Sequence, residues 1–192
     1  MGRRSKKSEI VETGKYLFMQ FGLKRVTVKE ICNKAGVSKA TFYNHFDNKN
    51  DLIKYIFNKL LEEGYEWLDE IEKQDLSFKE EVQKIIEYKK EKATQMKSLF
   101  VSEYLKESPE MAEFYQNYKE RSLKRSIEWV KRCQKEGKIR EALHPKFIMK
   151  MFRMTIKMMK NEKLANYYQD FTQYIEEIFE FLFYGILPRE DE

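Results

Sequence analysis

The chain has 192 residues, of which 42% are hydrophobic and 36% charged, and a formal net charge of +5. This apolar content excludes a wholly disordered chain, and 3 Pro and 7 Gly argue against a loop-rich β or collagen-like protein. With 2 Cys it cannot be a disulfide scaffold, so we expect a cytoplasmic protein. The most apolar stretch, residues 175–187, carries three glutamates, and we therefore expect no membrane-spanning segment.

The basic residues are concentrated near the N-terminus. Residues 1–50 contain eleven Lys or Arg and four Asp or Glu, a net charge of +7, whereas residues 51–192 carry a net charge of −2. A compact basic block beside a near-neutral remainder favours a nucleic-acid-binding module joined to a second domain. An ordinary Lys-rich solvated surface is the alternative interpretation.

The first predicted helix runs from about Ile10 to Phe21, because its apolar residues recur at helical spacing. Gly22 stands where a helix-ending glycine is typical. We expect the rings of Phe18 and Phe21 to face the core.

The second predicted helix begins at a capping box formed by Thr27 and Glu30. Gly36 breaks this helix, since the turn there requires a positive φ. Ser38 then caps a third, short helix that is predicted to continue through Phe46.

The rest of the chain also reads as helices. Asn48 caps a helix to about Glu70, and capping signals at Ser77 and at the Ser108–Pro109 pair start two more. The later predicted helices cover residues 77–96, 99–105, 108–137, 145–160 and 165–184. No strand-like alternation occurs, and the sequence therefore predicts an all-α fold.

Residues 27–46 predict a helix-turn-helix, in which two short helices are joined by a tight turn. Packing through Ile31, Val37 and Phe42 would leave the second helix free to enter a DNA groove about 12 Å wide. The exposed side of that helix would combine basic, hydroxyl and amide groups, which suit phosphates and base edges.

The stretch VTVKEICNKAGVSKATFYNHFDNKNDL (Val26–Leu52) resembles the DNA-binding domain of the tetracycline-repressor (TetR) family. The resemblance covers residues 8–60. The matching features are Thr27, Ile31, Ala35-Gly36-Val37-Ser38, Thr41, Tyr43, His45-Phe46, Lys49 and Leu52. Cys32 and Ala40 depart from the residues usual in the family without disrupting a helix.

The resemblance implies an N-terminal three-helix DNA-binding domain over residues 1–47 and a helical regulatory and dimerisation domain over residues 48–192. It further implies DNA contacts by Thr27, Ser38, Lys39, Ala40, Thr41, Tyr43, Asn44, His45 and Lys49. Thr27 and Ser38 are also expected to cap helices. Arg3, Arg4, Lys6 and Lys7 either form an arm along the DNA or a solubilising tail.

In the family, the last two long helices form a homodimer, which here corresponds to residues 145–184. Five of the nine Met residues fall within residues 149–159, and both helices are apolar over more than one face. Burial entirely within one subunit is the alternative.

The family also implies a pocket for a largely apolar or aromatic ligand among the middle helices. The candidate lining residues are Tyr88, Met96, Phe100, Tyr104, Phe114, Tyr118, Trp129, Met151 and Met158. Aromatic and Met residues at helical spacing are equally typical of an ordinary core.

The resulting hypothesis is a regulator, acting as a repressor, that binds a palindromic operator as a homodimer and is released by a small molecule. A helix-turn-helix regulator without an inducer, controlled by a protein partner or constitutive, is the alternative. An enzyme is not expected, because His45 and His144 are the two His and no phosphate-binding glycine loop occurs. Cys32 and Cys133 lack metal-ligand spacing, so neither a metal nor a cofactor is expected.

Overall fold

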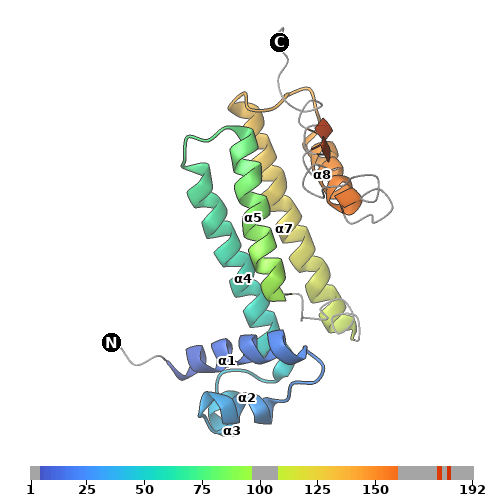
Figure 1. Ribbon diagram of the computed structural model, residues 1–192. Helices are drawn as coiled ribbons and strands as arrows, with labels where there is room; N and C mark the ends of the chain where they lie inside the picture. Colours follow the sequence, from blue (N-terminus) through green and yellow to red (C-terminus); the bar gives the residue numbers. More distant parts are fainter. Residues whose placement is uncertain (1–4, 97–107, 160–176, 179–180, 183–192) are drawn as a thin grey trace. The chain divides into compact units, whose positions relative to one another are not determined.

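The computed structural model describes residues 5–96, 108–159, 177–178 and 181–182 (Figure 1). These residues form helices without any strand, which confirms the predicted all-α fold. The helices are α1 (Lys6–Phe21), α2 (Val28–Ala35), α3 (Lys39–Tyr43), α4 (Lys49–Glu72), α5 (Phe78–Met96), α7 (Pro109–Lys135) and α8 (Pro145–Met159). The predicted helix 99–105 and most of 165–184 lie outside the described residues. None of the described helices is long and apolar enough to cross a membrane.

The chain divides into two compact units, one made of residues 1–73 and 84–120 and the other of residues 74–83 and 121–192. Helices α1 to α4 lie in the first unit and α8 in the second, while α5 and α7 contribute residues to both. The predicted domain boundary between residues 47 and 48 stays a prediction; α4 belongs to the same unit as the three helices before it.

Local capping groups start the long helices where the sequence predicts. The Ser77 N–H donates to Glu80 Oε2 at 2.8 Å, and the Glu80 N–H donates to Ser77 Oγ at 3.3 Å. Ser108 Oγ accepts from the Met111 N–H at 3.2 Å, directly before Pro109. These bonds satisfy amides that a helix N-terminus leaves without an intrahelical partner, which is why α5 and α7 begin at these residues.

In the first unit, α1, α2 and α3 gather around the beginning of α4 (Figure 1). The side chains of Ile10, Phe18, Phe42 and Leu52 are at most 1% exposed and form the centre of this core. Gly14 lets α1 approach α4 closely, because a Cβ there would lie 2.9 Å from Leu52 Cδ2. The small helices are thereby fixed to the start of α4.

Two details of the first unit differ from expectation. Phe21 is 48% exposed rather than buried, whereas Leu23 and Val26, which follow α1, are 1% and 2% exposed and belong to the core. Helix α3 ends at Tyr43 rather than at Phe46. The next residues form a turn, since the backbone must become extended at Asn48 before α4 begins.

The second unit is built around stacked aromatic rings and a short connection between α7 and α8. The rings of Phe78 and Trp129 stack with centroids 5.5 Å apart, and Phe152 lies against both. Gly137, at φ 68°, ends α7 in the left-handed conformation. The Gln134 amide then donates to backbone carbonyls of the connection, namely those of Arg140, Glu141 and Leu143. The connection is therefore held to the end of α7.

Candidate nucleic-acid interface

Helix α2 begins at the capping box that the sequence predicts at Thr27. Thr27 Oγ1 accepts from the Glu30 N–H at 3.2 Å, while Glu30 Oε2 accepts from the N–H and the hydroxyl of Thr27, both at 2.8 Å. These hydrogen bonds from Thr27 hold the pKa of the Glu30 carboxyl below its ordinary value. Thr27 is exposed, so its position at the helix N-terminus also allows contact with an anion.

The turn between α2 and α3 depends on Gly36, which has φ 63° and ψ 39°. A side chain there would meet nothing within 4 Å, so the cost of replacing this glycine is conformational rather than steric. The Val37 N–H donates to the Cys32 carbonyl at 3.1 Å and closes the turn. Partly buried Val37 then packs against the core and sets where α3 starts.

Helix α3 has a buried and an exposed side. Ser38 Oγ accepts from the Thr41 N–H at 3.0 Å and lies 2.9 Å from Thr41 Oγ1, which confirms Ser38 as a helix cap. Phe42 is 0% exposed, whereas Tyr43 is 53% exposed with the edge of its ring against Phe42. The exposed residues on and directly after α3 are Lys39, Ala40, Tyr43, Asn44 and His45, with Thr41 half-buried beside them.

This exposed side brings together an ammonium, a phenol, an amide and an imidazole on and directly after a short helix. Such groups donate to phosphate oxygens and to the acceptor atoms of base edges. Among the residues predicted to touch DNA, the structure therefore places all those of α3 and its following turn together.

Lys49 differs from the other predicted contacts because its ammonium points back into the protein. Nζ donates to the backbone carbonyls of Leu23 at 2.9 Å, Lys24 at 3.2 Å and Val26 at 3.0 Å. Spacing in the sequence did not reveal this arrangement, because the partners lie 23 to 26 residues away.

Two of the four basic N-terminal residues are within the described residues. Lys7 Nζ lies 4.2 Å from the ring centroid of Tyr55 and 5.7 Å from that of Phe46. Lys6 pairs with Glu9 at 2.7 Å. Lys7 therefore joins the beginning of α1 to the rings of Phe46 and Tyr55. Arg3 and Arg4 lie outside the described residues.

A groove of about 450 Å³ lies along α1 and α2 in the first unit. Arg25 Cζ lies 4.5 Å from the ring centroid of Phe21, and Lys34 Nζ lies 4.2 Å from the ring centroid of Tyr16. Cations therefore lie over these two exposed aromatic rings. Its lining residues are Leu17, Phe21, Arg25, Val26, Glu30, Asn33 and Lys34. None of the predicted ligand-pocket residues lines this groove.

The predicted pocket residues of the first unit pack against aromatic rings of α4. Tyr88 stacks on Trp67 with centroids 4.2 Å apart, and burial raises the pKa of its phenol, with the charges of Glu63 and Glu91 adding to the effect. Phe114 and Tyr118 meet the ring of Phe57 edge-on. Phe100 and Tyr104 lie outside the described residues, and Met96 is the last residue of α5.

In the second unit, Trp129 is 5% exposed and stacks on Phe78, while Met151 is half-buried and Met158 is 46% exposed. These contacts give Trp129 a packing role. The lining of a ligand pocket by any of the nine residues stays a prediction.

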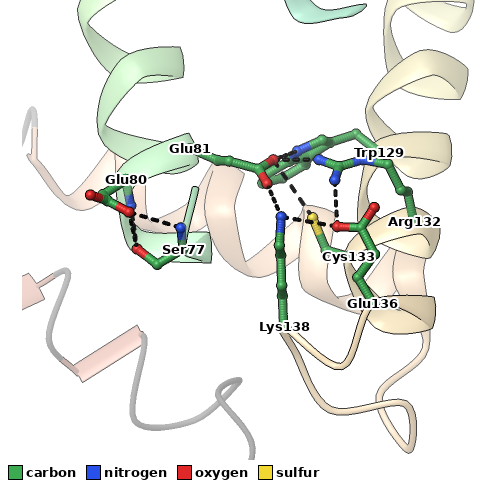
Figure 2. A network of polar contacts seen from close by, with 8 residues as sticks. All are labelled: Ser77, Glu80, Glu81, Trp129, Arg132, Cys133, Glu136 and Lys138. Carbon is green, nitrogen blue, oxygen red and sulfur yellow. Dashed lines mark hydrogen bonds and ion pairs between the residues drawn. The ribbon is translucent and has the colours of Figure 1, made fainter. Parts of the chain in front are cut away.

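The structure also contains a buried ionic cluster that the sequence did not reveal (Figure 2). Glu81, 0% exposed, accepts from Trp129 Nε1 and from Lys138 Nζ, both at 2.7 Å, and also pairs with the Arg132 guanidinium. Glu136 pairs with the same two cations, with Arg132 at 2.6 Å and Lys138 at 2.9 Å. The two carboxylates and two cations balance each other and join the beginning of α5 to the end of α7 within the second unit.

The surroundings of the cluster shift the pKa values of Cys133 and Glu136. Burial, followed by the charge of Glu81, raises the pKa of the Cys133 thiol to about 12. Although burial opposes ionisation of Glu136, hydrogen bonds from Arg132 and Lys138 outweigh it and lower the pKa of this carboxyl. Cys133 is therefore a protonated, packed thiol at neutral pH. Within the described residues, no group of His, Cys, Asp or Glu is arranged to hold a metal ion.

The N-terminal helices of the chain are similar to a known family of proteins. Residues 10–56 match the family described as "Bacterial regulatory proteins, tetR family". The uncharacterized HTH-type transcriptional regulator YhgD of Bacillus subtilis is 36% identical to this chain over 89 residues, which is 44% of this chain and 47% of YhgD. The chain thus matches about half the length of this curated relative.

Solved structures extend the likeness to nearly the whole chain at the level of fold. The fatty acid degradation regulator FadR from Bacillus halodurans has a TM-score of 0.70 at 16% identity and covers 95% of this chain and 96% of its own. The transcriptional regulator FadR from Bacillus subtilis, solved in complex with stearoyl-CoA, has a TM-score of 0.68 at 19% identity and covers 91% and 96%. These neighbours confirm the fold class.

Proposed function

Because residues 10–56 match the tetR family of bacterial regulatory proteins, we propose that this chain is a cytoplasmic transcriptional regulator that binds duplex DNA through α3. The observation that carries the proposal is the two-sided character of α3, which buries Phe42 and exposes Lys39 and Tyr43. We propose no enzymatic activity, cofactor or metal.

The chemistry of α3 suggests a division of contacts. Base edges in the major groove would meet the residues at the start and middle of α3, namely Lys39, Ala40, Thr41 and Tyr43. The phosphate backbone would meet the helix-capping residues and the turn after α3, namely Thr27, Ser38, Asn44 and His45. The basic excess of residues 1–50 would supply the electrostatic part of the affinity.

We propose that the chain binds a palindromic operator as a homodimer through residues 145–184. Support comes from α8, where Phe147, Met154 and Met158 are 52%, 49% and 46% exposed. A helix that exposes large apolar side chains is suited to a partner surface. A symmetric dimer would place two copies of α3 about 34 Å apart, one helical turn of DNA.

We propose that a largely apolar small molecule releases the protein from DNA, so that it acts as a repressor. The FadR of Bacillus subtilis, which has a similar fold, was solved in complex with stearoyl-CoA, a ligand that contains a long apolar acyl chain. In this chain, a ligand that displaced the ring of Tyr88 from Trp67 would act directly on α4. A coupling free energy of about 1–3 kcal/mol would change DNA affinity about 5–150-fold.

An in vitro selection of duplexes from a random library tests the DNA proposal. We expect recovery of a palindrome, and binding that weakens with salt at a slope of about −0.9 per phosphate neutralised. A single subunit in solution with no preference for any duplex over random DNA would contradict the proposal.

The second candidate is a regulator without an inducer. The ring contacts of Phe114, Tyr118 and Trp129 favour it, because such packing is equally typical of an ordinary core. A thermal-shift screen with acyl-CoA thioesters and planar aromatic compounds distinguishes the two. A compound that raises the melting temperature and releases DNA supports the inducer, whereas intact DNA binding with no stabilising compound supports the alternative.

A further inference from the structure

Lys49 is the first residue of α4, a position that electrostatics disfavours for a cation. The N-terminus of a helix carries a partial positive charge, so an ammonium there needs compensating oxygen atoms. The structure supplies them from one loop. Residues 22–26, which connect α1 to the cap of α2, turn three carbonyls toward Nζ, those of Leu23, Lys24 and Val26.

An ammonium has three N–H groups, and the three carbonyl oxygens at 2.9 to 3.2 Å can accept all of them. Leu23 and Val26 are 1% and 2% exposed and the bonds from Nζ to their carbonyls are partly buried, whereas Lys24 is exposed. A partly buried carbonyl that loses such a donor is less well compensated, and hydrogen bonds to charged groups are among the stronger ones.

We propose that Lys49 is a positioning residue for DNA recognition rather than a phosphate contact: its ammonium ties loop 22–26 to the start of α4 and so holds α2 and α3 in place. Val26 directly precedes Thr27, the cap of α2, so the tie acts one residue from the helix-turn-helix. Any movement of the start of α4 then reaches α2 through the loop as well as through the core. This inference rests on the proposed DNA binding.

The test compares Lys49→Met, Lys49→Arg and the control Lys39→Met, which removes an exposed cation from α3. Methionine keeps the length of the side chain without its charge. Arginine keeps the charge and binds phosphate well, but its planar guanidinium cannot present three hydrogens from one nitrogen to three converging carbonyls.

The first measurement is amide hydrogen exchange and melting temperature of the DNA-free protein. We expect both Lys49 variants to exchange the hydrogen-bonded amides of Gly22 and Thr27 at least about tenfold faster and to melt at least about 4 °C lower. Lys39→Met should leave both unchanged. Unchanged exchange and melting in Lys49→Met overturns the proposal. If Lys49→Met does not fold, Lys49→Arg decides by the same criterion.

The second measurement is the salt dependence of binding to a duplex that wild-type protein selects from a random library. A dimer that loses two phosphate contacts would reduce the slope of log K against log salt by about 1.8. We expect Lys49→Met to bind at least about tenfold more weakly with a slope that changes by less than about 0.5. A slope reduced by about 1.8 in Lys49→Met overturns the proposal, and so does wild-type affinity for the duplex in Lys49→Arg. If wild-type protein selects no duplex, the DNA-binding proposal fails, and exchange and melting alone decide whether the tie exists.

Discussion

Replacing Glu81 by Ala tests how much the buried ionic cluster contributes to stability. The substitution removes a carboxylate that is 0% exposed and accepts from Trp129, Arg132 and Lys138. Removing one partner from a buried ion pair costs about 3–5 kcal/mol, because the remaining charge is left without compensation. Here Glu136 stays within 2.6 Å of Arg132 and 2.9 Å of Lys138, which favours the lower end of that range.

A loss of about 3 kcal/mol corresponds to a melting temperature about 6–12 °C lower for a chain of this size. Differential scanning calorimetry and urea unfolding of Glu81→Ala measure it. The matched control is Glu87→Ala on the same helix, where the carboxylate is exposed and the expected change is within about 0.5 kcal/mol. Glu81→Gln, which keeps the shape and one acceptor oxygen, should fall between the two. A Glu81→Ala protein as stable as wild type would show that the cluster does not hold α5 to α7.

Three further predictions concern other parts of the molecule. Tyr43→Ala should weaken duplex binding at least about tenfold in a fluorescence-anisotropy titration without lowering the melting temperature. The control Tyr16→Ala, which changes a similarly exposed residue of α1, should bind the duplex normally, and equal losses of affinity would contradict the assignment of α3. Gly14→Val should lower the free energy of unfolding in urea by about 1–3 kcal/mol, because the new side chain overpacks against α4. Gly64→Ala, whose added Cβ makes only an ordinary contact at 3.8 Å, should raise it by about 0.5–1 kcal/mol, and a stabilising Gly14→Val would refute the close approach of α1 to α4. Cys133, whose pKa is raised to about 12 by burial, should resist iodoacetamide at pH 8 in the native protein, and rapid labelling detected by mass spectrometry would contradict the burial of this thiol. The stability of the protein should fall as pH rises above the unfolded thiol pKa of 9.0, because only the unfolded state then ionises.

Features set by neighbouring residues could be predicted from the sequence. The capping boxes at Thr27 and Ser77 and the start signal at Ser108 depend on partners three residues away, and the structure contains the hydrogen bonds that they predict. Gly36 is equally local, since a positive φ is required wherever α2 must stop before α3. Such signals were sufficient for the order of the helices among the described residues and for the position of the helix-turn-helix.

Features that depend on distant partners could not be predicted. Glu81 follows the capping residue Glu80 and reads as another carboxylate on a solvated helix face, but its partners lie 48 to 57 residues further along the chain. Lys49 reads as an exposed cation at a helix start, and its partners precede it by 23 to 26 residues. In both cases the groups that the fold brings to the charge, rather than its position in a pattern, decide its surroundings.

These distant contacts bear on how α4 would transmit a signal in the proposed mechanism. Its 24 residues span about 36 Å at 1.5 Å per residue. Near its far end Trp67 stacks on Tyr88, and at its beginning Lys49 holds loop 22–26 while Leu52 packs in the core with Phe42. Because the beginning is attached both to the loop and to the core, α2 and α3 should follow α4 as one body. A tilt of about 5° over that length displaces one end by about 3 Å relative to the other. This displacement is as long as a hydrogen bond of about 3 Å, so it is enough to break the bonds that base recognition requires. A ligand that moves the Trp67–Tyr88 stack therefore needs to cause only a small tilt to disturb the fit of α3 to DNA, and loss of the Lys49 tie should weaken that response to ligand as well as DNA affinity itself.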